Sequence, residues 1–206
     1  MKKIIFLVII IHIYSLFAQD GWQWQNPLPF GDAIQKVFFI DELDGWMAPF
    51  NPTLLRSTDG GDNWEIIYTD IIFNDIFFID PLEGWAIGDS TVEGTLYSIY
   101  HTTDGGETWE IQLADTTVRY DIYFVDRLHG WACGGGPGGT LVSTKNGGKK
   151  WKRQAEGLFG LGDVIFGITF IDSLKGWTVG GINWGLYTLD GGRPGRETPA
   201  WREHES

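Results

Sequence analysis

The chain of 206 residues contains a single cysteine, Cys133, and few basic residues. One cysteine allows no intrachain disulfide, so packing has to hold the fold together. We expect Cys133, in an apolar stretch beside Trp131, to be a small buried side chain rather than a nucleophile. Only 15 Lys and Arg stand against 27 Asp and Glu, for a formal net charge of −12. A surface this acidic repels phosphate, which argues against nucleic acid and anionic membranes as partners.

An apolar run long enough to cross a bilayer is also missing. Residues 1–18 carry Lys2 and Lys3, then an apolar stretch and Ala18, an order typical of a secretory signal peptide. The apolar stretch is about 15 residues long and a transmembrane helix needs about 20. We therefore expect cleavage after Ala18, export to the periplasm, cell surface or medium, and no membrane insertion afterwards. An uncleaved anchor is the alternative. Cleavage removes both lysines and leaves a net charge of −14.

Glycine and tryptophan are abundant, with 29 and 11 residues, and many of them belong to a repeat. A first phrase, Phe-Ile/Val-Asp-x-x-x-Gly-Trp, begins at Phe39, Phe78, Phe124 and Phe170. A second phrase, Asp-Gly-Gly-x-x-Trp, follows each copy, with Asn in place of Asp in the third. Its key residues are Asp59, Gly61 and Trp64; Asp104, Gly106 and Trp109; Asn146, Gly148 and Trp151; and Asp190 in a degenerate fourth copy.

Each repeat unit predicts four short strands. In the first unit they cover Ile34–Ile40, Gly45–Ala48, Thr53–Ser57 and Trp64–Tyr68. No segment longer than about ten residues shows helical periodicity. Four short antiparallel strands in every 40 to 45 residues or so are typical of a β-propeller blade. We therefore predict an all-β propeller of about four visible blades in residues 19–192, followed by an irregular or truncated tail in residues 193–206.

The lengths of the connections divide the loops into two groups. Wherever a phrase has its Trp, the Trp lies five positions after the Asp or Asn, as from Asp41 to Trp46, whereas the connections between phrases vary in length. We expect the constant turns on one face of the propeller and the variable loops on the other, where binding is usually built. In or beside these loops lie Arg119, Phe159 and Trp184, the candidate partner-binding residues.

The second phrase invites comparison with calcium loops. An EF-hand loop needs oxygen ligands at alternating positions, and here the second and third positions are glycines. A structural turn accounts for the residues better: the Asp carboxylate accepts backbone N–H groups, the glycines take positive φ, and the Trp packs on the next strand. Asn146 can make the same turn but is a poor ligand for a cation. We therefore predict structural Asp-box residues and no metal.

The second phrase resembles the Asp-box, or BNR, motif of sialidases and related propellers. Both phrases, and the opening Trp22-Gln23-Trp24-Gln25-Asn26-Pro27, are similar to the photosystem II assembly/stability factor family and to exported bacterial propellers that share its repeat. The resemblance covers nearly all of residues 20–192 and implies a propeller that binds a protein or peptide. Photosynthetic members are associated with a basic patch, from which this acidic chain departs, so the exported bacterial branch is the expected assignment.

Trp24 lies 22 positions before Trp46, which matches the 21 positions from Trp64 to Trp85 and the 22 from Trp109 to Trp131. Gln23–Asn26 therefore reads as an isolated fourth strand, which in a propeller completes the last blade. Either four blades close with this strand, or the chain is the N-terminal portion of a larger ring. The abrupt end of the repeat after Gly192 favours the larger ring.

Catalytic motifs are hard to find. A sialidase needs an arginine cluster, yet between Asp20 and Lys150 only Arg56, Arg119 and Arg127 occur. Xyloglucanase-type hydrolases use two carboxylates, and no spacing selects a pair from the acids, which we expect to be ordinary solvated groups. These acids include Asp75, Asp89, Glu93 and Asp121.

His101, His129 and His204 have no zinc-ligand spacing, and no cofactor motif is present. The leading hypothesis is a non-catalytic exported propeller that binds a protein or peptide and needs no cofactor. A carbohydrate-active or carbohydrate-binding propeller is the alternative, in which Trp184 would stack on sugar rings. A structural repeat within a larger surface protein fits the same residues.

Overall fold

A computed structural model describes residues 31–90, 97–137, 140–154, 161–181 and 185–192 of the chain. Within these ranges the secondary structure consists of fifteen strands. No helix in the described part is long and apolar enough to cross a membrane. The expected signal peptide, the strand at Gln23–Asn26 and the tail after Gly192 lie outside the described residues and remain predictions.

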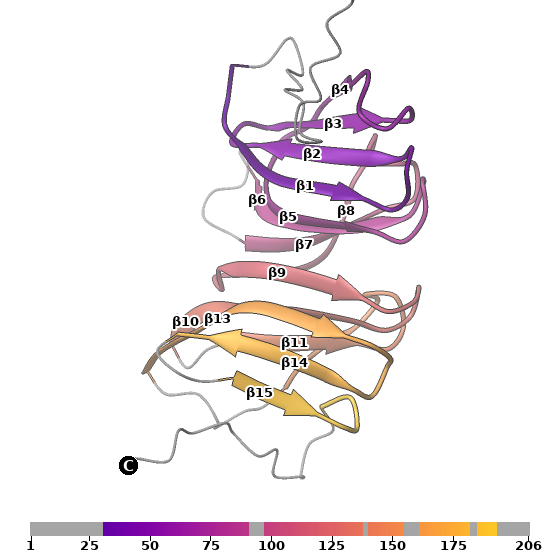
Figure 1. The fold of residues 1–206 in the computed structure, drawn as a ribbon. Helices are drawn as coiled ribbons and strands as arrows, with labels where there is room; N and C mark the ends of the chain where they lie inside the picture. Colours follow the sequence, from indigo (N-terminus) through magenta and orange to yellow (C-terminus); the bar gives the residue numbers. More distant parts are fainter. Residues whose placement is uncertain (1–30, 91–96, 138–139, 155–160, 182–184, 193–206) are drawn as a thin grey trace, which may run out of the picture.

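The strands form consecutive antiparallel meanders, which are the blades of a propeller (Figure 1). Blade 1 consists of β1 (Ile34–Phe39), β2 (Gly45–Pro49), β3 (Thr53–Ser57) and β4 (Glu65–Tyr68). Blade 2 consists of β5 (Ile71–Phe78), β6 (Gly84–Ser90), β7 (Tyr97–Thr102) and β8 (Glu110–Asp115). Blade 3 consists of β9 (Arg119–Phe124), β10 (Gly130–Pro137), β11 (Thr140–Thr144) and β12 (Trp151–Arg153). Blade 4 shows β13 (Leu161–Phe170), β14 (Gly176–Gly180) and β15 (Gly185–Thr188). The all-β propeller prediction is confirmed.

The first strands of the four blades, β1, β5, β9 and β13, are neighbours along the array, and we call the surface they form the inner face. Both constant turns of each blade lie at one end of the strands, and the variable connections lie at the opposite end (Figure 1). This is the division that the loop lengths predict.

The first strand of blade 4, β13, has ten residues, against six to eight in the other blades, because it already begins at Leu161. The added residues pair with the extended end of β10, with Gly135 opposite Val164. Two variable connections thus continue as a β-ladder that joins blades 3 and 4 into one sheet. Pairing satisfies backbone groups that an irregular loop would leave to solvent.

Face-to-face aromatic stacking joins each blade to the next. Trp85 on β6 stacks on Phe124 of blade 3, with ring centroids 3.7 Å apart and planes 12° from parallel. The other face of the Phe124 ring covers Gly130, where a Cβ atom would lie 2.3 Å from the ring. Trp46 with Phe78 and Trp131 with Phe170 repeat the stack at 3.8 and 3.5 Å. The first phrase therefore encodes a ring held between a glycine and a tryptophan of the preceding blade.

The apolar core accordingly lies between the blades rather than within a single sheet. One buried cluster joins blades 1 and 2, a second joins blades 2 and 3, and a third joins blades 3 and 4. Cys133 is fully buried in the third cluster, as predicted. Its apolar surroundings and the nearby carboxyl groups of Asp121 and Asp75 raise its thiol pKa, which keeps it unreactive.

The Asp-box turn has the geometry of a side-chain-capped loop. Asp104 accepts hydrogen bonds from the Thr102 hydroxyl at 2.7 Å and from the Thr108 backbone N–H at 2.9 Å. The Trp109 indole donates to the Gly106 carbonyl at 3.0 Å. Gly105 and Gly106 have φ of 79° and 101°, which side chains with a Cβ rarely adopt.

In all four Asp boxes a Ser or Thr hydroxyl donates to the Asp or Asn side chain. Asn146 accepts from Thr144 and from the Lys150 N–H, both at 3.0 Å, so an amide oxygen serves as well as a carboxylate. In all four blades, one backbone hydrogen bond also joins the Asp box to the first-phrase turn of the same blade. The bonds run from Gly60 to Leu43, Gly105 to Leu82, Gly147 to Leu128 and Gly191 to Leu174, with lengths between 2.7 and 3.0 Å.

Substitution of Gly130 by Ala is expected to destabilise the protein by ~1–3 kcal/mol, because the Phe124 ring beneath it is held in place by Trp85. Gly181→Ala is the matched control, since a Cβ atom there meets nothing within 4 Å, and should stay within about 0.5 kcal/mol. Urea unfolding followed by tryptophan fluorescence measures both. Equal stability of the two variants would contradict the stacking account.

Replacement of Asp104 by Asn should be nearly neutral, because Asn146 performs the same turn in blade 3. Asp104→Ala should cost ~1–2 kcal/mol, since the Thr102 hydroxyl and the Thr108 N–H lose their acceptor. Thermal unfolding with added calcium or with a chelator should give the same midpoint for the parent protein. A calcium-dependent midpoint that the Asn variant abolishes would instead indicate a metal site.

Candidate functional site

Of the three candidate partner-binding residues, the structure describes Arg119. Arg119 begins β9 beside a variable connection, but its side chain is only 2% exposed. Its guanidinium binds both carboxylate oxygens of Asp115, at 3.1 and 2.8 Å, and the Thr117 carbonyl at 3.2 Å. The positive charge of Arg119 is therefore neutralised by a neighbouring residue of the chain and does not face solvent. Phe159 and Trp184 lie outside the described residues.

A row of charged residues crosses the inner face at one position, three residues before the first-phrase Phe. The residues are Lys36 in blade 1, Asp75 in blade 2 and Asp121 in blade 3, and blade 4 has Gly167 there. We call Lys36, Asp75 and Asp121 the inner-face ladder. The Lys36 ammonium lies 2.6 Å from a carboxylate oxygen of Asp75, which is buried. The expectation that these acids are ordinary solvated groups is wrong, because the first strands of adjacent blades enclose them.

The carboxylates of the ladder cap backbone groups on the following blade. Asp75 accepts a hydrogen bond from the Ile122 N–H at 3.0 Å, and Asp121 accepts one from the Ile168 N–H at 2.7 Å. First strands have no neighbouring strand on their inner side, so these N–H groups would otherwise lack a ladder partner. Each acid therefore replaces part of the missing strand pairing and links two blades.

Asp121 carries an unusual protonation state. Burial, and then hydrogen bonding to Asp75 and repulsion by its charge, raise the pKa of Asp121 from 3.8 to about 7. Lys36 and the Ile168 N–H act in the opposite direction but do not offset these effects. Because two carboxyl groups at hydrogen-bonding distance resist double ionisation, the pair holds one proton over much of the range below neutrality.

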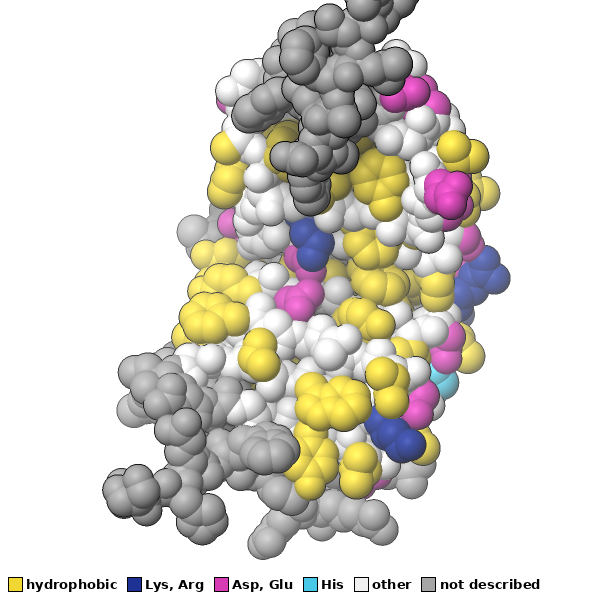
Figure 2. Space-filling view, in the orientation of Figure 1, with side chains coloured by type: hydrophobic (Ala, Val, Ile, Leu, Met, Phe, Trp, Pro, Cys, Tyr) yellow, Lys and Arg dark blue, Asp and Glu magenta, His cyan; other side chains and the backbone are white. Residues whose placement is uncertain are grey.

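Exposed aromatic side chains lie beside the ladder. Tyr120 and Phe166, next to Asp121 and Gly167 along their strands, have ring centroids 5.8 Å apart and are 43% and 56% exposed. Tyr120 is the additional residue of a β-bulge in the pairing of β9 with β10, between Arg119 opposite Gly134 and Asp121 opposite Cys133. Further along the inner face Phe77 contacts Phe38 and Tyr123, each with centroids 5.2 Å apart. Figure 2 shows basic and acidic side chains in the middle of this face, with apolar side chains on both sides.

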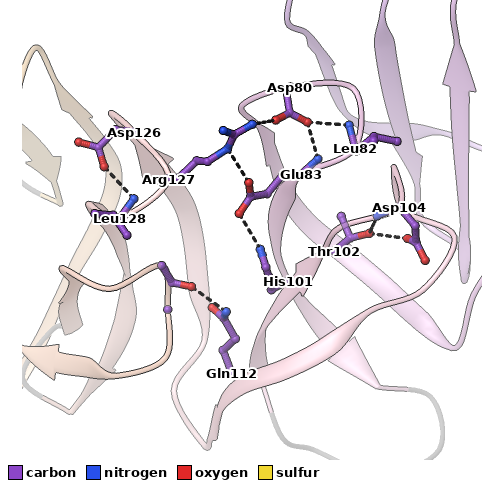
Figure 3. Close-up of polar contacts among 12 residues, drawn as sticks. Asp80, Leu82, Glu83, His101, Thr102, Asp104, Gln112, Asp126, Arg127 and Leu128 are labelled. Carbon is purple, nitrogen blue, oxygen red and sulfur yellow. Dashed lines mark hydrogen bonds and ion pairs between the residues drawn. The ribbon is translucent and has the colours of Figure 1, made fainter.

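The constant-turn end holds a second polar cluster, which joins blades 2 and 3 (Figure 3). Arg127 pairs with Asp80 and, at 2.7 Å, with Glu83, while the His101 ring lies 3.3 Å from Glu83. Gln112 donates to the Gly147 carbonyl at 2.8 Å across the same junction. Both carboxylates are thus engaged by partners from the chain. Among the described residues no three His, Cys, Asp or Glu side chains converge in a metal-binding arrangement.

Sequence reasoning missed the inner-face ladder and the Tyr120–Phe166 pair. An alignment of the four units on the first-phrase Phe would have placed Lys36, Asp75 and Asp121 in one column, and this signal was available. The same alignment would have placed Tyr120 and Phe166 in the preceding column, where the structure has a β-bulge in every blade.

Four-stranded antiparallel blades, rings stacked between blades and turns capped by Asp and Trp define this molecule as an Asp-box, or BNR-repeat, β-propeller. The particular resemblance follows from the sequence: residues 16–113 match the family model of the photosynthesis system II assembly factor YCF48. The predicted resemblance to that family is confirmed. Among curated proteins, none matches the sequence.

Solved structures agree with this assignment. YCF48 bound to a D1 peptide is 25% identical, with a TM-score of 0.61, over 86% of this chain and 57% of that one. YCF48 from Cyanidioschyzon merolae is 19% identical, with a TM-score of 0.57, over 80% of this chain and 55% of that one. The chain thus spans little more than half the length of these two proteins.

Glycoside hydrolases of family GH74 share the fold. The xyloglucanase from Xanthomonas campestris is 14% identical, with a TM-score of 0.55, over 78% of this chain and 28% of that one. The enzyme from Niastella koreensis is 13% identical, with a TM-score of 0.60, over 84% of this chain and 30% of that one. At this identity the likeness concerns the fold alone.

The Asp121 carboxyl predicts an unusual pH dependence of stability. The folded protein keeps a proton that the unfolded chain loses between about pH 4 and pH 7, so stability should fall as pH rises through that window. Asp121→Asn should flatten the curve and raise stability at neutral pH by on the order of 1–2 kcal/mol, because an amide mimics the protonated acid. Urea unfolding across this pH range measures the effect. Asp62→Asn, at an exposed turn position, is the control and should leave the curve unchanged; an unchanged curve for Asp121→Asn would contradict the shared proton.

Proposed function

We propose that this chain is an exported, non-catalytic propeller that binds a protein or peptide at the variable-loop end of its inner face. The observation that carries the proposal is the exposed Tyr120–Phe166 pair beside the Asp121 carboxyl. Exposed aromatic pairs next to a polar group are typical anchor sites for a partner side chain. Support also comes from YCF48, the similar propeller whose structure was solved with a D1 peptide. Export rests on the N-terminal 18 residues.

The charges on this face favour a partner of particular chemistry. The chain has a formal net charge of −12, and the ammonium of Lys36 is paired with Asp75. Arg119 is likewise neutralised by Asp115. An acidic segment would meet no free cation on the described part of the inner face. A neutral or basic peptide with an apolar side chain suits the aromatic pair and the neighbouring carboxyl.

The carboxyl groups give little support to hydrolysis. Asp75 and Asp121 hydrogen-bond to one another, and Asp75 is buried. Inverting glycosidases hold their two acids roughly 6.5–9.5 Å apart to admit a water, and retaining ones about 5–5.5 Å apart around the sugar. Asp89 is partly buried, which raises its pKa, and neither Asp75 nor Asp121 contributes to this shift. Glu93 lies outside the described residues. A binding role therefore fits these acids better than catalysis.

Parallel peptide and glycan arrays test the proposal, with a fluorescent version of the strongest array ligand used for affinity measurements. We expect peptide binding that weakens about tenfold or more in Tyr120→Ala and in Phe166→Ala, since both are exposed anchors. Tyr68→Ala is the matched control, because Tyr68 is exposed on β4 at the outer edge of blade 1. Binding of glycans alone, or hydrolysis of xyloglucan, would overturn the proposal.

A further inference from the structure

The Asp-box turn of blade 3 carries the opposite charge from the equivalent turns of blades 1 and 2. Residues 58–66 of blade 1 and 103–111 of blade 2 each contain three acids and no basic residue, whereas the equivalent residues 145–153 contain five basic residues and no acid. The acids are Asp59, Asp62 and Glu65, and Asp104, Glu107 and Glu110. The basic residues are Lys145, Lys149, Lys150, Lys152 and Arg153, which we call the basic turn.

The charges of the basic turn face solvent. All five side chains are exposed, and none forms an ion pair with a carboxylate of the residues that the structure describes. Lys36, Arg119 and Arg127, by contrast, are each paired with an acid. Blade 3 has a described blade on both sides, so this exposure does not come from a position at the end of the array.

Asn146 removes the one carboxylate that the basic turn would otherwise contain. Its amide oxygen accepts hydrogen bonds from the Thr144 hydroxyl and the Lys150 N–H, both at 3.0 Å, so the turn keeps its geometry without a negative charge. The fold does not require this exchange, because the equivalent turns of blades 1 and 2 are capped by Asp59 and Asp104.

Protection of the sheet edge explains only part of the basic turn. Charged residues on an outer strand hinder pairing with other chains, and β12 is the outer strand of blade 3. Lys152 and Arg153 lie on β12, but the other three lysines lie in the turn before it. The outer strands β4 and β8 begin with Glu65 and Glu110, so edge protection does not require a basic residue either.

An exposed apolar side chain adjoins the basic turn. The Leu128 carbonyl accepts a hydrogen bond from the Gly147 N–H at 3.0 Å, and the Leu128 side chain is 53% exposed. Trp151 is the one aromatic residue in residues 145–153, and it is half-buried and contacts Phe124 edge-on. The surface therefore offers an aliphatic contact beside the cations and lacks an exposed ring on which nucleobases stack.

We propose that the basic turn and Leu128 bind an acidic peptide segment of another protein, with its carboxylates on the cations and an apolar side chain on Leu128. Polyphosphates and acidic polysaccharides have no side chain for the leucine contact. A flat anionic membrane would also meet the acidic turns of blades 1 and 2, which lie at the same end of the strands (Figure 1). A narrow peptide can contact blade 3 alone.

The net charge of −12 does not prevent this contact. Screening limits the reach of each charge to about 8 Å at physiological ionic strength, so the nearest charges dominate once the peptide is in contact. The site lies at the opposite end of the strands from the peptide site proposed for the inner face, and it does not depend on that site.

Fluorescence anisotropy with the full chain and a labelled peptide of alternating Glu and Leu tests the proposal. Lys149→Glu should weaken binding at least ~tenfold, because an attractive charge becomes a repulsive one. The fold tolerates Glu at this position, since blade 2 has Glu107 there. Lys175→Glu is the matched control. It makes the same change of charge at an exposed lysine of blade 4, and screening should keep its effect below about threefold.

A second pair of variants tests the apolar contact. Leu128→Ala should weaken binding of the Glu–Leu peptide about threefold or more, because it removes apolar surface from the contact. Leu43→Ala is its control, since Leu43 is the equivalent exposed leucine of blade 1, where the turn is acidic, and should leave the affinity unchanged.

The same assay separates this site from the inner face and from other anions. Tyr120→Ala should leave binding of the Glu–Leu peptide unchanged. The proposal is wrong if a peptide with Gln in place of Glu binds equally well, if Lys149→Glu binds like the parent protein, or if Tyr120→Ala abolishes binding. It is also wrong if polyphosphate, heparin, single-stranded DNA or phosphatidylglycerol vesicles bind more tightly than the peptide, because the basic turn would then serve a different class of anion.

Discussion

Stacking of one phenylalanine ring between a glycine and a tryptophan is the interaction on which this structure depends. The glycine lies on the strand next to the Phe, and the tryptophan comes from the preceding blade, as with Phe124 between Gly130 and Trp85. A blade is a thin sheet with little core of its own, so its stability comes from its neighbours. The stacked rings lie with their centroids 3.5 to 3.8 Å apart. At this distance the glycine cannot carry a side chain, and neither aromatic residue can be replaced by a smaller one without loss of the stack.

Two kinds of turn then hold the strands in register at one end of the blades. The Asp-box turn uses a side-chain oxygen and two glycines with positive φ, and a backbone hydrogen bond ties it to the first-phrase turn. Because the same residues form the same two turns in every blade, the sequence and length of these turns have little freedom to vary. The opposite end and the inner face carry the variation, and there the chain places its buried acids and exposed aromatic pair.

The candidate site was only partly predictable from the sequence. The loop lengths correctly separate a constant end from a variable end, yet Arg119, chosen because it is charged and near a loop, turns inward to Asp115. The burial of Asp75 and the partial burial of Asp121 were missed because an acid-rich chain makes solvated carboxylates the ordinary expectation. Their enclosure depends on how closely the first strands of neighbouring blades approach one another, and no short stretch of sequence reports that distance.

By itself the sequence determined the repeat, the four-strand blade, the Asp-box turns and the resemblance to a propeller family. These follow from local contacts that recur at a fixed interval, so they are visible as phrases. Only the tertiary structure decided which charges are paired, which carboxyl keeps its proton, which aromatic rings stay exposed and how β10 pairs with β13. Those properties arise between residues from 29 positions apart, as for Gly135 and Val164, to 47 positions apart, as for Asp121 and Ile168, or from a bulge that shifts one strand by one residue. Physical proximity rather than local pattern sets them.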